Sequence, residues 1–251
     1  MTTRVMLVTG GSRGIGAATA KLAAARGYDV AVNYAGRKDA ADDVVAAVEA
    51  LGQRAVAIQA NVADEAAVAK LYATVDETFG RLDCLVNNAG ILEAKSLAVD
   101  IPLERLRTVL AVNVVGAFQC AQEAVKRMAR SRGGDGGAIV NLSSIAARLG
   151  GAGEYVDYGL SKGAIDTLTI GLAKEVAGDG IRVNAVRPGL IYTDIHARGG
   201  VPDRVDRLAD QVPVKRGGTA EEVAETILWL ASDQASYCTG TFVDVAGGRG
   251  I

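Results

Sequence analysis

Short aliphatic runs alternate with longer helical patterns along all 251 residues, and this alternation restricts the fold more than any other feature of the chain. Parallel strands need crossover connections, so repeated strand–helix units predict a parallel sheet with helices on both faces. Most of the runs are continuously aliphatic, as expected of strands buried on both sides. The predicted strands are Arg4–Thr9, Asp29–Tyr34, Ala55–Gln59, Cys84–Asn87, Ala138–Leu142, Arg182–Val186 and Thr241–Val245.

Helical patterns fill most of the remaining chain. No linker interrupts the alternation, so we expect one domain over residues 1–251. The least regular segment, Thr193–Gly218, is rich in Arg, Gly and Pro, and we expect a mobile loop there that closes on a substrate. The predicted helices are Ile15–Arg26, Ala40–Leu51, Glu65–Phe79, Leu103–Arg130, Tyr155–Ala177 and Glu221–Ser232.

Composition excludes several classes of protein. The formal net charge is −2 and aromatic residues make up 4% of the chain, which argues against a nucleic-acid-binding protein. The three cysteines are far apart and His196 is the single histidine, so we expect neither a disulfide framework nor a metal site. The strand at Val5–Thr9 leaves no room for a signal peptide, and no apolar run is long enough to span a bilayer. We therefore expect a cytoplasmic protein.

A glycine-rich turn follows the first strand, in the segment Thr9–Gly16. Glycines at 10, 14 and 16 allow a tight turn, close approach of the backbone to a pyrophosphate, and close packing of the helix on the strand. The N-terminus of the following helix offers free N–H groups to the phosphates. This strand–turn–helix unit predicts a Rossmann fold, a doubly wound sheet of about seven parallel strands that binds a dinucleotide.

The end of the second strand indicates which dinucleotide is bound. NAD-dependent enzymes place a carboxylate there, on the ribose hydroxyls. This strand ends in Asn33 and Tyr34, and the first acid afterwards is Asp39. Arg13, Arg37 and Lys38 supply cations nearby, so NADP(H) is favoured over NAD(H), although Arg37 and Lys38 could be only solvated surface charges.

Tyr158 and Lys162 are the candidate reacting pair. They stand four residues apart in a predicted helix and therefore share one face. Bringing a phenol from a pKa of about 10 to near neutrality takes about 4 kcal/mol. An ammonium about 4 Å away supplies roughly that much. Such a tyrosine could exchange a proton with an alcohol oxygen while a nicotinamide exchanges hydride.

Taken together, these motifs resemble the classical short-chain dehydrogenase/reductase family. The resemblance extends over nearly the whole chain and includes Thr9–Gly16, Asn87–Gly90, Asn141–Ser144, Tyr158–Lys162 and Arg187–Gly189. It implies that Tyr158 transfers the proton and that Ser144 binds the substrate oxygen. It also implies that Lys162 binds the nicotinamide ribose and that Asn113 holds a water linking this lysine to solvent. The three residues between Tyr158 and Lys162 argue against the enoyl-reductase branch, whose spacing is wider.

The resemblance also implies the cofactor contacts. Asn61 stands where the family usually has an aspartate on the adenine amino group, and its amide oxygen can accept the same hydrogen bond. The residues expected to bind the cofactor are Gly10, Ser12, Arg13, Gly14, Ile15, Gly16, Asn33, Tyr34, Asn61, Val62, Asn88, Ala89, Gly90, Tyr158, Lys162, Pro188, Gly189, Ile191 and Thr193.

The substrate is left open by the sequence, beyond a small molecule with a carbonyl or alcohol group. The chain is similar to 3-oxoacyl-carrier-protein reductases and to glucose 1-dehydrogenases. An acidic acyl carrier protein would need a basic patch. Five residues could form one, or could be solvated helix faces: Lys126, Arg127, Arg130, Arg132 and Lys174.

Two further expectations concern assembly and a rival function. The family resemblance and extra apolar positions on the two long helices imply a homotetramer. The rival from another class is a protein that senses NADP(H) without turnover. The presence of all four catalytic positions argues against it.

Overall fold

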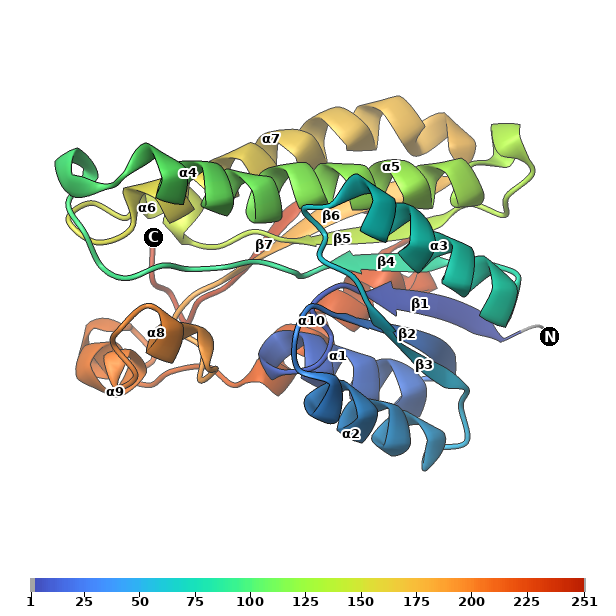
Figure 1. Ribbon diagram of the computed structural model, residues 1–251, viewed down its shortest axis with the longest axis horizontal. Helices are drawn as coiled ribbons and strands as arrows, with labels where there is room; N and C mark the ends of the chain where they lie inside the picture. The colour runs from blue at the N-terminus through green and yellow to red at the C-terminus, as the bar shows by residue number, and fades with distance from the viewer. Residues whose placement is uncertain (1–2, 251) are drawn as a thin grey trace.

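The structure, a computed structural model, describes residues 3–250 and contains one parallel sheet (Figure 1). The seven strands lie in the order β3-β2-β1-β4-β5-β6-β7, and every neighbouring pair is parallel. The predicted fold class is therefore confirmed. The strands are β1 Arg4–Val8, β2 Tyr28–Tyr34, β3 Ala55–Gln59, β4 Cys84–Asn87, β5 Gly137–Leu142, β6 Ile181–Pro188 and β7 Phe242–Val245.

Helices cover both faces of the sheet and form two separate cores (Figure 1). On one face lie α1 (Gly14–Ala25), α2 (Lys38–Glu49) and α10 (Ala220–Ala231). On the other face lie α3 (Glu65–Phe79), α5 (Ala117–Met128) and α7 (Val156–Val176). The aliphatic strands alternate their side chains between these cores, which is why they read as continuous apolar runs.

The strand order places the candidate site. Strand β1 pairs with β2 on one side and with β4 on the other. The chain therefore builds the sheet outward from β1 in one direction through β2 and β3, and then in the opposite direction from β4 onward. Ligands of open parallel sheets bind at such a switch point, beyond the carboxyl ends of the strands. The glycine-rich turn after β1 and the Asn88–Gly90 run after β4 both lie there.

The predicted helix Leu103–Arg130 is divided into three parts. These are α4 (Leu103–Leu110), a π-helical turn over Ala111–Gly116, and α5. By length and composition alone, Leu103–Met128 could cross a membrane, contrary to the sequence expectation: it has 26 residues and contains an 18-residue window with a mean hydropathy of 1.2. In the fold this helical region packs against α3, α7 and β4, as a core helix does.

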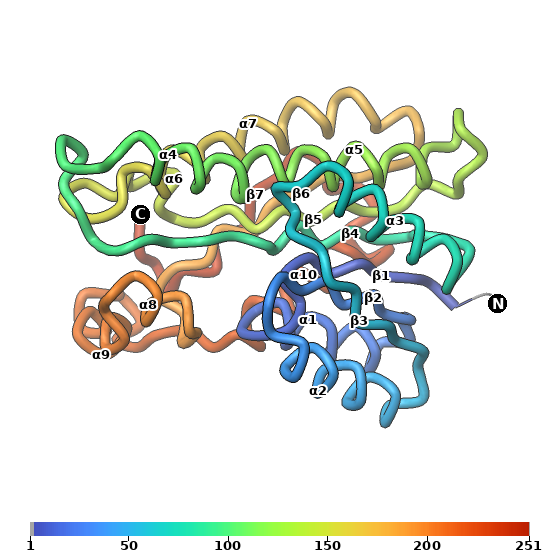
Figure 2. Tube along the Cα trace, viewed as in Figure 1, coloured from blue at the N-terminus to red at the C-terminus, as the bar shows by residue number. Residues whose placement is uncertain are grey.

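The segment Thr193–Gly218 is more ordered than the sequence indicates. It contains α8 (Ile195–Arg198) and α9 (Arg204–Leu208), which lie at the carboxyl end of the sheet (Figure 2). Val205 and Val212 pack with Leu190 in a small core of their own. Helices this short carry almost no periodicity, so composition alone indicates an irregular loop.

Candidate active site

A single cleft of about 880 Å³ opens at the carboxyl ends of the strands. Its lining includes every residue predicted for catalysis or cofactor binding except Gly16 and Asn113. Those two lie just behind the surface of the cleft and act through other groups, as described below. Residues far apart in the sequence thus meet in one concave site, which is the usual form of a small-molecule site.

The glycine-rich turn is held in a fixed shape. Gly10 and Gly14 have φ values of +62° and +52°, which other residues rarely adopt. A Cβ on Gly16 would lie 2.4 Å from the carbonyl oxygen of Gly10 and 2.6 Å from the amide nitrogen of Asn88. Asn88 in turn donates to the carbonyl oxygens of Thr9 and Gly10 at 2.8 and 3.0 Å. Gly16 therefore shapes the cradle, which fits a pyrophosphate at the start of α1.

Asn33 supports this turn from below. Its side-chain oxygen accepts a hydrogen bond from the Gly10 amide at 3.2 Å. Its amide nitrogen donates to the carbonyl oxygens of Ile58 and Ala60 at 3.3 and 3.0 Å. The residue is 1% exposed, so its side chain is committed to the protein although it borders the cleft. The sequence predicts that Asn33 binds the cofactor, and it gives no sign that Asn33 supports the glycine-rich turn.

The cations expected at the end of β2 are only partly available. Arg13 and Arg37 both line the cleft. Arg37 also makes a bidentate pair with the exposed Asp39, with nitrogen–oxygen distances of 2.8 to 3.2 Å. Lys38 is bound instead to Asp42 at 2.6 Å and lies outside the cleft lining. This end of the cleft therefore presents two arginines and, within its lining, no carboxylate from β2 or the turn after it, which fits a 2′-phosphate.

The candidate catalytic groups meet at the middle of the cleft. Tyr158 and Lys162 lie on α7, and the Lys162 ammonium is 5.6 Å from the centre of the Tyr158 ring. Ser144, beyond the end of β5, is hydrogen-bonded to the Tyr158 hydroxyl. Lys162 donates to the carbonyl oxygen of Leu142 at 2.6 Å. The backbone at the end of β5 thus fixes both the serine and the lysine around the phenol.

Burial decides how these groups titrate. It raises the pKa of Tyr158 to about 12, and the hydrogen bond from Ser144 opposes this only in part. It lowers the pKa of Lys162 to about 8, against the attraction of Asp166. The expectation that the ammonium makes the phenol acidic is therefore wrong. Loss of hydration raises the pKa of Tyr158, and the group that acts to lower it is Ser144, through its hydrogen bond.

Asn113 lies in the π-helical turn and joins three segments. Its amide nitrogen donates to the Ile91 carbonyl oxygen and to the Ser161 hydroxyl, both at 3.0 Å. Its side-chain oxygen accepts from the Ile91 amide at 2.8 Å. Both amide hydrogens are thus engaged, and the helix is tied to the loop after β4 and to α7. The expected role in holding a water stays a prediction.

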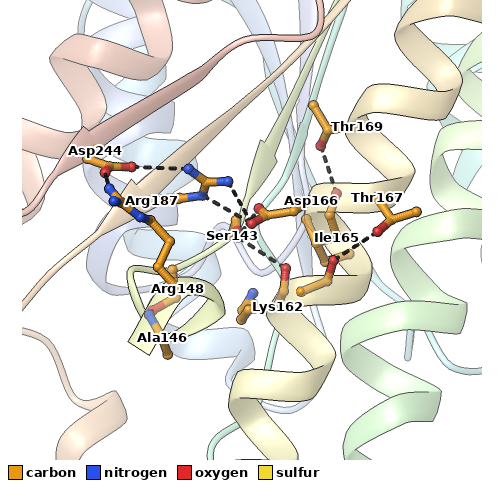
Figure 3. Close-up of polar contacts among 12 residues, drawn as sticks. Ser143, Ala146, Arg148, Lys162, Ile165, Asp166, Thr167, Thr169, Arg187 and Asp244 are labelled. Atoms are coloured by element: carbon orange, nitrogen blue, oxygen red, sulfur yellow. Dashed lines mark hydrogen bonds and ion pairs between the residues drawn. The ribbon is translucent and has the colours of Figure 1, made fainter. Parts of the chain in front are cut away.

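A network of charged groups supports the back of the site (Figure 3). Arg187 lies between two carboxylates, with Asp166 at 2.8 Å and Asp244 at 3.6 Å. Ser143 donates to Asp166 at 2.6 Å, so its hydroxyl is occupied and Ser144 is the serine that faces Tyr158. The sequence analysis missed Asp166, although its position one helical turn after Lys162 could have indicated it.

The far end of the cleft was not anticipated either. Arg204 is bound to Glu154 at 2.9 Å and lies over the ring of Tyr155 at 5.1 Å. His196, the single histidine, is half-buried and borders the cleft, with Nε2 3.0 Å from the carbonyl oxygen of Ile191. These contacts join segments fifty residues apart, as from Glu154 to Arg204, and no local spacing signals them.

Comparisons with known proteins agree with this geometry. A family model described as enoyl-(acyl carrier protein) reductase matches residues 10–249. The chain is 56% identical to the Escherichia coli uncharacterized oxidoreductase YgfF over 98% of its own length and 99% of the relative. It is 42% identical to the 3-oxoacyl-[acyl-carrier-protein] reductase FabG of Staphylococcus epidermidis, over 96% and 97%.

A solved structure also resembles the chain over nearly its whole length. The short chain dehydrogenase from Burkholderia cenocepacia, in complex with NADP, superposes with a TM-score of 0.88 and 38% identity. The match covers 98% of this chain and 97% of that one. With the fold, the order of the motifs and the relatives in agreement, the chain belongs to the short-chain dehydrogenase/reductase family of oxidoreductases.

Proposed function

We propose that this oxidoreductase uses NADP(H) to interconvert a carbonyl compound and a secondary alcohol. The observation that carries the proposal is the meeting of Tyr158, Ser144 and Lys162 in the same cleft as the glycine cradle. Proton-coupled hydride transfer requires a proton donor, a group that stabilises charge and a bound dinucleotide. The two hydroxyls, the buried ammonium and the glycine cradle can supply these.

The residues have distinct roles in this reaction. When bound, NADPH supplies the hydride that adds to the carbonyl carbon. The Ser144 hydroxyl holds the substrate oxygen and stabilises the negative charge that develops on it. The Tyr158 hydroxyl gives its proton to that oxygen, and the raised pKa of Tyr158 ensures that the proton is present at neutral pH. The Lys162 ammonium, fixed by Leu142, then stabilises the phenolate that remains.

The preference for NADP(H) over NAD(H) has two supports. Arg13 and Arg37 line the end of the cleft that follows β2, where a carboxylate would repel a 2′-phosphate. The Burkholderia relative is described in complex with NADP. A 2′-phosphate would compete with Asp39 for the Arg37 guanidinium, which makes bidentate pairs with either group.

Carbonyl reduction is favoured over reduction of an enoyl double bond. The matched family model is described as an enoyl reductase, but Tyr158 and Lys162 have the narrower spacing of the carbonyl-reducing branch. Of the specific activities, 3-oxoacyl-carrier-protein reduction is supported by the FabG relatives. Against a docked carrier protein, Lys126 and Arg127 are already paired with Glu123, at 2.6 and 2.7 Å. A glucose dehydrogenase activity has no further support.

A substrate panel tests the proposal. The protein is mixed with NADPH and 3-oxoacyl thioesters, diketones or simple ketones, and with NADP and alcohols or sugars, while nicotinamide absorbance is followed. Tyr158→Phe should abolish turnover and leave the Kd for NADPH within a few-fold, because only the proton donor is lost. Turnover retained in Tyr158→Phe would refute the mechanism. Tight NADPH binding without turnover of any substrate would instead favour the sensing function.

We also propose a cytoplasmic homotetramer. Helices α5 and α7 lie on the same face of the sheet (Figure 1) and leave large apolar side chains exposed. Phe118 of α5 is 49% exposed, and Val115 of the adjoining π-helical turn is 53% exposed. On α7, Leu160 and Ile170 are 53% and 41% exposed. An apolar face of this kind is usually an interface. A monomer mass by light scattering at micromolar concentration would contradict the proposal.

A further inference from the structure

The chain after β7 brings one arginine into the far end of the cleft. A Cβ on Gly248 would lie 2.8 Å from Pro213, and one on Gly250 would lie 2.7 Å from Ile145. The tail is therefore held between the segment 193–218 and the loop before α6 (Ala146–Leu149). Arg249 lies between these two glycines, is half-buried and lines the cleft.

The Arg249 guanidinium forms no hydrogen bond or ion pair with any group of residues 3–250, although Glu154 lies near enough to act on it electrostatically. Other arginines at this end are paired, Arg204 with Glu154 at 2.9 Å and Arg198 with Glu93 at 3.1 Å. Burial and the positive charge of Arg204 lower the pKa of Arg249, whereas Glu154 opposes them. An unpaired cation held beside another cation in a cleft costs free energy, and an anion would remove that cost.

Arg249 belongs to the substrate end of the cleft, not to the nucleotide end. Arg13 and Arg37 come from the segments around α1 and α2, whereas the end of the chain runs toward α6 (Figure 1). Arg204, its charged neighbour, lies over the ring of Tyr155, three residues before Tyr158. The cleft lining also includes the apolar side chains of Leu92, Ile145, Leu149 and Leu190, of which Ile145 and Leu149 lie against Gly250, next to Arg249.

We propose that Arg249 binds an oxyanion group, a carboxylate or a phosphate, on the carbonyl substrate. The proposal rests on the proposed function of the site and adds the substrate class: a carbonyl at Tyr158, an apolar middle and an anionic end. A guanidinium pairs with either oxyanion through two parallel hydrogen bonds. Six basic and two acidic side chains line the cleft, so it attracts an anionic substrate as well as the cofactor, although the whole chain carries a net charge of −2.

Matched substrates test this assignment. Aliphatic keto acids of increasing length, their methyl esters and the corresponding keto phosphates are each reduced with NADPH, and kcat/KM is compared. For the wild type, we expect one anionic series to exceed the esters on the order of 10- to 100-fold, the usual contribution of a charge-assisted hydrogen bond. The preferred series identifies the oxyanion as carboxylate or phosphate.

Substitutions of single arginines then test whether the preference for anionic substrates comes from Arg249. Arg249→Gln should lose the preference for the anion and keep its activity on the esters, and Arg249→Lys should restore part of the preference. Arg216→Gln makes the same change of charge outside the cleft, where Arg216 is paired with Glu222, and should behave like the wild type. Calorimetry of the keto acids with the NADP-bound protein measures the same differences as Kd values.

The two proposals fail in different ways. Reduction of esters and acids with equal kcat/KM, or an unchanged anion preference in Arg249→Gln, would overturn the role of Arg249 and leave the proposed function intact. Failure to reduce any carbonyl compound would overturn the proposed function. In that event, equal Kd values for the acids in wild type and Arg249→Gln, or no binding at all, would overturn the role of Arg249 as well.

Discussion

The free-energy cost of burying a charge at this site can be measured at Lys162. Its pKa falls from 10.5 to about 8 in the folded protein, chiefly because burial removes water from the ammonium. At about 1.4 kcal/mol per pH unit, this difference corresponds to about 3 kcal/mol of stability lost while the amine stays charged. Lys162→Met keeps a side chain of similar length and removes the charge, so it removes the pH dependence of that cost.

The sign follows from the protons bound by each state. Between the folded pKa of about 8 and the unfolded pKa of 10.5, the unfolded chain binds more protons at Lys162, so stability increases with pH. Below pH 8 the full cost is present, and above pH 10.5 it has vanished. Relative to Lys162→Met, the wild type should therefore gain about 1 kcal/mol between pH 7 and pH 9, and about 2–3 kcal/mol by pH 10.

Urea denaturation of the cofactor-free protein, repeated from pH 6 to pH 10, measures this difference. At each pH, the free energy of unfolding of the variant is subtracted from that of the wild type, which removes the contributions of groups that titrate in both proteins. Lys174→Met is the matched control, because Lys174 is exposed on the same helix and its difference from the wild type should stay flat. A flat difference for Lys162→Met as well, or one that runs in the opposite direction, would show that the ammonium is not destabilised by burial.

Three other outcomes are expected. Arg37→Ala should raise the KM for NADPH more than that for NADH, because the phosphate loses a guanidinium, and an unchanged ratio would move the selection to Arg13. Asn33→Asp should lower the free energy of unfolding by about 1–3 kcal/mol in urea, because two carbonyl oxygens lose their donor; unaltered stability would make those bonds unimportant. Asp166→Asn should lower the free energy of unfolding by about 2 kcal/mol, because the longer contact with Asp244 becomes the one ion pair of Arg187. A loss within about 0.5 kcal/mol would show that the ion pair with Asp244 is sufficient.

The parts of the fold that the sequence predicted are those with a strong local signal. Strand β1 carries an unbroken apolar run over Val5–Val8, all of it buried. Helix α3 begins directly after Asp64, whose side chain caps the amide of Ala67. The glycine-rich turn is equally readable, because positive φ at Gly10 and Gly14 requires glycine. Local chemistry at these positions agrees with the global fold.

The parts that escaped prediction depend on contacts between distant segments. The break in the helix over 103–130 reflects bonds from Asn113 to Ile91 and Ser161, and a π-helical turn has no sequence period of its own. The far end of the cleft is built by Glu154, Arg204 and Arg249, which only the folded chain brings together. Loop residues that set substrate choice are thus the least readable from sequence.

The pKa of Tyr158 could not be predicted from the spacing of residues along the helix. An i, i+4 spacing correctly places Tyr158 and Lys162 on one helical face, but it carries no information on how much water remains there. Lys162 is buried and Tyr158 is half-buried. Each side chain loses hydration, so the two pKa values move apart: that of Tyr158 rises and that of Lys162 falls. A protonated phenol is the form needed to donate to a carbonyl, so burial prepares the reductive direction. The reverse reaction needs added positive charge beside the phenol before the proton can leave.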